Sequence, residues 1–217
     1  MTAFDAGIAL HPTYVRQRAL AAGFTYPSRA EQEPLAGWSD FPVWPSLWRY
    51  VYDCLQGSGF PPLDELVGYL MAMTRSPLDD AGIRARAQKL VMDFTRDIHA
   101  YALLIHSGRF GAVSYERILD LGYNVDFRVR MQTELTAVGI QTAMRASWGN
   151  EPWTAIKEER RRRRGDKEWT GEIVWMTNRR IPAEHLPNKL WLFTMGHVDE
   201  VVAAINEGLA SQSTLPF

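Results

Sequence analysis

The stretch SYERILDLGYNVDFRVRMQTELTAVGIQTAMRAS, residues 114–147, decides which fold this chain is expected to adopt. It divides into three segments of strand length, at residues 115–120, 123–131 and 137–146. In the second segment apolar and polar residues alternate from Tyr123 to Arg130, a period of two that is typical of a strand with one buried face. The alternation places Asp126, Arg128 and Arg130 on one side of this predicted strand.

The segments that follow residue 80 predict helices and strands around this stretch. Between residues 80 and 107 apolar residues recur with a period of 3.6, which predicts one long helix. Two continuous apolar runs, residues 172–178 and 190–195, are typical of strands that are covered on both faces. Helices are expected at residues 151–163 and 198–209. The predicted order is therefore helix, three strands, helix, two strands and helix, which describes a mixed α/β (α+β) core with a central sheet.

Residues 1–79 are expected to form an N-terminal, aromatic-rich helical extension to the α/β core of residues 80–217. Short helices are predicted at residues 14–22, 46–56 and 63–74. Seven aromatic residues fall within 23 positions: Trp38, Phe41, Trp44, Trp48, Tyr50, Tyr52 and Phe60. They suit either a platform that stacks on bases or a hydrophobic cluster that fixes this segment. Their helical spacing favours the cluster.

Composition limits the classes of function that the chain can have. Its 217 residues suit one domain with an elaborated end, and 46% apolar residues are enough for a core. The net charge of −1 gives no global attraction to nucleic acid, although 20 of the 24 basic residues are arginines. The single cysteine, Cys54, excludes an internal disulfide. No apolar run reaches about 18 residues, so a soluble, cytoplasmic protein without a membrane partner is expected.

The order of elements, together with the phrase GYNVDFRV and the later GIQTA, resembles the restriction-endonuclease-like fold of the PD-(D/E)xK nuclease superfamily. In that family the second strand carries a metal-binding Asp, and the third carries a (D/E/Q)-x-K pair. By this resemblance, which covers residues 80–211, Asp126 matches the metal-binding Asp and Gln141 matches the second position. Ala143 stands at the place of the catalytic Lys. Arg145 supplies a charge two residues further on, but a guanidinium is a poor general base.

The resemblance implies metal-dependent hydrolysis of phosphodiester bonds, with Mg²⁺ as the cofactor. Mg²⁺ prefers oxygen ligands, usually one or two carboxylates besides water and phosphate. Asp126 is the first candidate ligand, Glu116 and Asp120 are candidates for the second, and Asp97 and Glu134 stay open. The competing interpretation makes Asp126 a solvent-facing strand residue that pairs with a neighbouring arginine.

A run of five arginines is the strongest local charge in the sequence. The run is Arg160, Arg161, Arg162, Arg163 and Arg164. It suits contact with the phosphates of nucleic acid, and Arg179 and Arg180 extend the same patch. It also suits a solvated helix end, where cations interact well with the helix dipole and the flanking acidic residues offset part of the charge.

Two hypotheses from different classes follow. The first is a DNA-acting protein, a metal-dependent endodeoxyribonuclease that uses Asp126, Gln141 and Arg145. The second is a non-catalytic nucleic-acid-binding or assembly protein that keeps the fold, and Ala143 favours it. Double-stranded DNA is the expected partner in both, and a homodimer stays open. The five histidines lack the spacing of a metal motif and are expected in structural or surface positions.

Overall fold

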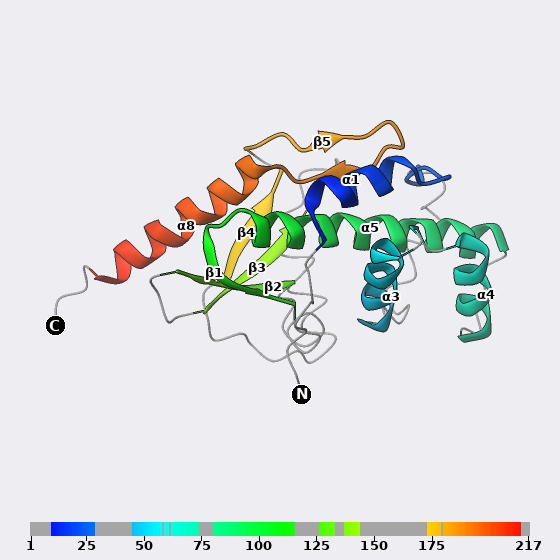
Figure 1. Cartoon of the computed structure of the whole chain (residues 1–217), viewed down its shortest axis with the longest axis horizontal. Helices are drawn as coiled ribbons and strands as arrows, with labels where there is room; N and C mark the ends of the chain where they lie inside the picture. Colours follow the sequence, from blue (N-terminus) through cyan, green and yellow to red (C-terminus); the bar gives the residue numbers. More distant parts are fainter. Residues whose placement is uncertain are drawn as a thin grey trace. The chain divides into compact units, whose positions relative to one another are not determined.

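The structure, a computed structural model, describes residues 10–28, 45–57, 59–60, 62–73, 80–115, 126–132, 137–143, 173–178 and 180–213. These residues form helices and a four-stranded mixed sheet, which confirms the predicted mixed α/β class (Figure 1). They fall into two compact units. The helical unit comprises the described residues within 10–102 and 184–192, and the sheet unit comprises those within 103–183 and 193–213. A restriction-endonuclease-like core and a domain boundary after residue 79 stay predictions.

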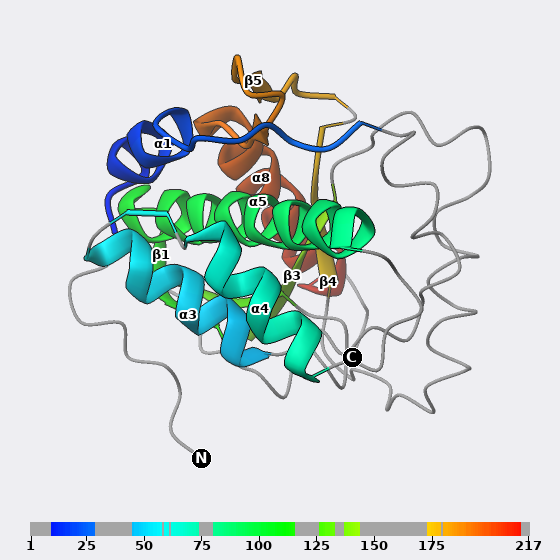
Figure 2. The ribbon, with the colours of Figure 1, turned by 90° about the vertical axis from the view of Figure 1, so that its right-hand side faces the viewer.

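The helical unit combines four helical segments with a small hairpin. Its elements are α1 (Pro12–Leu20), α3 (Pro45–Gln56), α4 (Leu63–Met73), most of α5 (Asp80–His106), β5 (Glu184–His185) and β6 (Trp191–Leu192). Figures 1 and 2 show α1 on one side of α5, and α3 and α4 on the other. The helices predicted in this part of the sequence are confirmed, with ends that differ by about two residues at most from those expected.

Aromatic side chains fill part of the interior of the helical unit. Trp48 and Tyr52, one turn apart on α3, stack with their ring centroids 5.4 Å apart. Tyr101 of α5 meets Trp48 edge to face at 5.9 Å. Because these rings are buried, the hydrophobic-cluster interpretation is confirmed for Trp48 and Tyr52, whereas Tyr50 of the same helix is exposed. Trp38, Phe41 and Trp44 lie outside the described residues.

The sheet unit contains a three-stranded antiparallel meander, a fourth strand and the last helix. Its elements are β1 (Phe110–Ser114), β2 (Phe127–Met131), β3 (Ala137–Ala143), β4 (Ile173–Thr177) and α8 (Met195–Ser213). The strand order is β1-β2-β3-β4, with β4 parallel to β3. Helix α8 packs against β4. A parallel neighbour needs a long connection, which the chain provides between residues 143 and 173.

The pairing of β2 with β3 confirms the alternation that the sequence predicted for the second strand. Phe127 pairs with Ile140 and Val129 pairs with Val138, and all four side chains are buried. Arg128, between Phe127 and Val129, is exposed, as is Arg130. The apolar pairs therefore form the core face of the meander, and the arginines lie on its other face.

The prediction of the first strand at residues 115–120 was wrong for Tyr115, and residues 116–120 lie outside the part of the chain that the structure describes. The observed strand, β1, ends at Ser114, and Tyr115 follows it outside any strand. Helix α5 ends at His106, and Gly108, with a φ of 68°, turns the chain directly into β1. The register against β2 shifts at Gly111, where a Cβ would lie 3.2 Å from the Cα of Gln132. These two glycines signal a tight entry into the strand as well as the end of a helix.

The prediction of a long buried strand at residues 190–195 was also wrong. Within this run only Trp191 and Leu192 are in strand conformation, and they pair with His185 and Glu184. Helix α8 then starts at Met195 because the backbone N–H of Thr194 donates to Nδ1 of His197, which closes its first turn. The apolar run therefore reflects burial in two different elements. Within the described residues, none of the helices is both long and apolar enough to cross a membrane.

Candidate nucleic-acid and metal site

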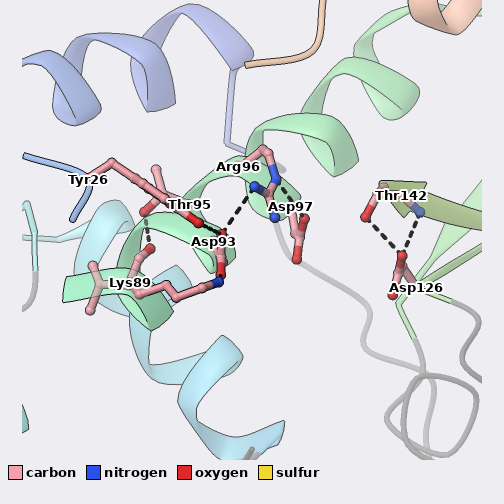
Figure 3. Close-up of polar contacts among 9 residues, drawn as sticks. Tyr26, Lys89, Asp93, Thr95, Arg96, Asp97, Asp126 and Thr142 are labelled. Atoms are coloured by element: carbon pink, nitrogen blue, oxygen red, sulfur yellow. Dashed lines mark hydrogen bonds and ion pairs between the residues drawn. The ribbon is translucent and has the colours of Figure 1, made fainter. Parts of the chain in front are cut away.

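Asp126 lies where β2 meets β3 in the sheet unit. Its backbone N–H donates to the carbonyl oxygen of Ile140 at 3.0 Å. Its carboxylate oxygen Oδ2 accepts two hydrogen bonds from Thr142, from the backbone N–H at 2.6 Å and from the hydroxyl at 2.9 Å (Figure 3). Since Ile140 and Thr142 flank Gln141, the structure brings the backbone of Gln141 beside Asp126.

The local sequence explains why this carboxylate has a fixed position. The regular β2–β3 ladder ends at the pair Phe127 and Ile140. One residue further, the side chain of Asp126 takes the place of a backbone carbonyl as the acceptor for the N–H of Thr142. Hydrogen bonds to an ionised acceptor are roughly twice as strong as neutral ones. The carboxylate is therefore oriented by β3 before any ligand binds, which is what a binding or catalytic group needs.

Two arginines follow Asp126 along β2. Arg128 and Arg130 are exposed and pair with Gly139 and Ala137 of β3. Side chains of cross-strand partners lie on the same face of a sheet, and glycine and alanine occupy little of that face. Both arginine side chains are exposed on this face, and a guanidinium can make planar, bidentate contact with phosphate oxygens.

The structure places a few of the other predicted residues and leaves most of them outside the part it describes. The backbone of Gln141 lies in β3, and Ala143 is the last residue of that strand. Arg180 is described: its side chain is 85% exposed and lies 3.8 Å from the carboxylate of Glu200. The rest lie outside the described residues: Glu116, Asp120, Glu134, Arg145, Arg160, Arg161, Arg162, Arg163, Arg164 and Arg179.

The residues at Asp126 meet only part of what a Mg²⁺ site requires. An ionised carboxylate has about four lone-pair sites, and the bonds to Thr142 use two of them, so metal coordination is compatible with these bonds. In the described part of the chain, groups of three or more His, Cys, Asp or Glu residues able to hold a metal are absent. Glu116 and Asp120, the predicted candidates for a second ligand, lie outside the described residues.

A polar cluster around Asp93 in the helical unit escaped the sequence analysis. The carboxylate of Asp93 pairs with the ammonium of Lys89, accepts a hydrogen bond from the hydroxyl of Tyr26 at 3.1 Å and lies 3.1 Å from the guanidinium of Arg96 (Figure 3). Burial alone would raise the pKa of Asp93, but Lys89 and Arg96 outweigh it and hold that pKa below its ordinary value. The cluster ties residue 26 to α5, so its role is structural.

A signal for this cluster is present in the sequence of α5. Lys89, Asp93 and Arg96 follow one another at spacings of four and three residues, which places them on one side of a helix. Asp97, a predicted alternative metal ligand, belongs to the same helix and lies 3.6 Å from the guanidinium of Arg96. Charges at such spacings beside an apolar stripe indicate a partly buried ion-pair network.

Two of the histidines are buried, in agreement with a structural role. His197 accepts the hydrogen bond that starts α8. His99 of α5 is only 4% exposed, and its Nδ1 lies without a hydrogen-bond partner in the described structure. Burial lowers the pKa of His99 to about 4, against a weaker opposing effect of Glu184. Burial of this ring therefore favours its neutral form.

No protein-family model, curated protein or solved structure matches this chain. The resemblance to PD-(D/E)xK nucleases stays a prediction.

Proposed function

We propose that this protein acts on DNA as a metal-dependent endonuclease, with Asp126 as a metal ligand at the end of β2. The observation that carries the proposal is the fixed carboxylate of Asp126, which two hydrogen bonds from Thr142 hold beside Gln141. A divalent metal at such a carboxylate polarises the phosphate and lowers the pKa of a water molecule. Asp126 would hold the metal, and Gln141 would supply a neutral oxygen.

A nuclease must also hold the phosphate backbone of its DNA substrate, and the basic residues of this chain suit that task. Arg128 and Arg130 are exposed on β2, two and four residues after Asp126. Arg180 adds another exposed cation in the same unit. Arg145 and the run 160–164, which lie outside the described residues, are further proposed phosphate contacts. Arg145 stabilises charge at the phosphate and leaves proton abstraction to another group, because its guanidinium stays protonated.

A second function is favoured by the same contacts at Asp126. Its bonds to Thr142 give the carboxylate a structural task in joining β2 to β3, and that task needs no metal. Ala143, at the end of β3, has no group that can act as an acid or base. We infer that the alternative to an endonuclease is a non-catalytic protein that binds duplex DNA through the same arginines.

One pair of assays separates these functions. The purified chain is incubated with supercoiled plasmid DNA in Mg²⁺, in Mn²⁺ and in EDTA, and binding to a labelled duplex is measured in parallel. The endonuclease proposal predicts nicked or linear plasmid with either metal and none in EDTA. Binding without cleavage in either metal would establish the second function. If the chain neither binds nor cleaves DNA, both proposals are contradicted.

A further inference from the structure

The hairpin of residues 184–192 presents a rigid, exposed aromatic surface in the helical unit. Its strands alternate strictly: Leu186, Leu190 and Leu192 are buried, whereas His185 and Trp191 are exposed. The leucines pack with Ala19 of α1 and Met92 of α5 in one core cluster. One face of the hairpin is therefore anchored in the core, and the other displays an imidazole and an indole ring.

The turn of this hairpin is held by a dense set of hydrogen bonds. The buried amide of Asn188 donates to the carbonyl oxygen of Ala19 at 2.6 Å and accepts from the N–H of Leu190 at 3.3 Å. The carbonyl oxygen of Asn188 accepts from the N–H of Tyr26 at 2.8 Å. Lys189 follows with a φ of 65°, and its side chain is exposed at the tip of the turn. Such bonding fixes the surface before a partner arrives, which lowers the entropy cost of binding.

The two exposed rings form one pair. His185 and Trp191 are directly opposite each other in the β5–β6 ladder, and their ring centroids lie 4.6 Å apart. Trp191 is nevertheless 45% exposed, the highest fraction among the large apolar side chains known to be exposed in the described chain. An indole fixed on a strand with much of its surface in water offers a flat stacking area.

The charges around the rings favour a polyanion as the partner. Helix α1 contains Arg16 and Arg18 and has no acidic residue, while the hairpin contains Lys189 and one acid, Glu184. Arg16 binds the carboxylate of Glu184 at 2.5 Å, which places α1 beside β5 and neutralises that acid. Three cations against one anion leave a net charge of +2 on α1 and the hairpin, in a chain whose total is −1. This local excess is the electrostatic condition for phosphate binding.

We propose that this face of the hairpin binds single-stranded nucleic acid, with a base stacked on the indole of Trp191, to which the His185 ring is tilted by 54°, and the adjacent phosphates near Lys189. An unpaired base exposes the flat surface that an indole stacks on, whereas bases inside a duplex are already stacked on each other. Basic residues combined with exposed aromatic rings are the features that single-strand binding requires. The surface is built without Asp126 and without a metal, so it adds a second contact to the proposed action on DNA.

The test is a titration of the full-length chain into fluorescein-labelled oligothymidylate and oligouridylate, followed by fluorescence anisotropy at low salt in EDTA. EDTA keeps the measurement independent of metal-dependent cleavage. Trp191→Ala should weaken binding about 5- to 150-fold, which corresponds to the stacking of one base at about 1–3 kcal/mol. Trp191→Phe should retain most of the affinity. Lys189→Gln should lower the slope of log K against log salt by about 0.7.

Two controls make the outcome specific. Met71→Ala removes a side chain of equal exposure on α4 and should leave binding unchanged. An oligonucleotide of the same length without bases should bind the wild-type chain as weakly as oligothymidylate binds Trp191→Ala. The inference is overturned if the folded wild-type chain binds neither oligonucleotide, or if Trp191→Ala binds both as well as the wild type does. The relative affinity for the two oligonucleotides shows whether the surface prefers DNA, prefers RNA or binds both.

Discussion

At the scale of single residues, Asp126 and Thr142 form the contact on which the candidate site depends. Asp126→Ala removes the acceptor of two hydrogen bonds and should lower the free energy of unfolding by about 1.5–3 kcal/mol. Asp126→Asn keeps an acceptor oxygen and should cost less. Thr142→Val removes only the hydroxyl. Urea unfolding of Asp126→Ala, Thr142→Val and the double variant should give a coupling energy above about 0.5 kcal/mol, and additive effects would show that the contact is absent in solution.

His99 should make the stability of the fold depend on pH. Its pKa in the folded chain is about 4, below the ordinary 6.5 that applies once the chain unfolds. As pH falls through 6.5, the unfolded state takes up a proton that the folded state excludes, so stability is full above this window and declines toward pH 4. The loss between pH 7 and pH 5 should be about 2 kcal/mol.

The comparison that isolates this effect uses two histidines of the same helix. Urea unfolding at pH 7 and pH 5 should show the loss in the wild type and in His106→Gln, whose histidine is exposed near the end of α5. His99→Phe should lose about 2 kcal/mol less over the same interval, even if its stability at pH 7 is lower. Equal losses in all three chains would mean that His99 is accessible to protons in the folded state.

At the scale of elements, the hairpin β5–β6 depends on one buried amide. Asn188→Ala leaves the carbonyl of Ala19 and the N–H of Leu190 without their side-chain partner, so it should destabilise the chain by about 1–3 kcal/mol. Asn206→Ala is the matched control, because Asn206 is exposed on α8. Thermal unfolding should show a lower midpoint for the first variant alone. A similar midpoint for both would mean that Asn188 is not buried in the turn.

The elements also show what the sequence could predict. The alternation around Phe127 and Val129 identified β2 and its buried face, since a period of two has few other causes. The same reasoning failed at residues 190–195, because continuous apolar runs occur wherever a chain is buried. There Leu192 belongs to a strand, and Thr194 starts the turn into α8. Glycine is an ambiguous signal for a related reason. Gly108 lies two residues after the end of α5 and two residues before the start of β1, so it marks both boundaries.

The candidate site, like the fold, was predicted from the sequence only in part. Asp126 and Gln141 were named from the resemblance to the PD-(D/E)xK nucleases, and the β2–β3 pairing brings the two positions together. The partner of Asp126 was not predictable, because Thr142 reaches it only through a ladder that becomes irregular after Phe127. The cluster around Asp93 was missed because apolar periodicity dominates the reading of a long helix. Lys89 and Arg96 can be recognised as partners of Asp93 only when the structure shows that these side chains are partly buried.

At the scale of the whole molecule, the arginine run 160–164 should determine how strongly the chain binds duplex DNA. Changing all five residues to glutamine removes cations that release counterions from the duplex, so the salt dependence should become shallower by up to about 4 in the slope of log K against log salt. Anisotropy titrations at several salt concentrations measure this slope. An unchanged slope would assign the run to a solvated helix end and leave phosphate contact to residues such as Arg128 and Arg180.

The most direct test of the central claim is single-turnover cleavage of plasmid DNA in Mn²⁺ by three forms of the chain. Asp126→Asn removes the charge of the proposed metal ligand, whereas Asp199→Asn changes an exposed carboxylate of α8 that pairs with Arg109. The wild type and Asp199→Asn should cleave at similar rates, and Asp126→Asn should be inactive while its circular dichroism spectrum and unfolding midpoint stay close to those of the wild type. Cleavage by Asp126→Asn at the wild-type rate would contradict the account.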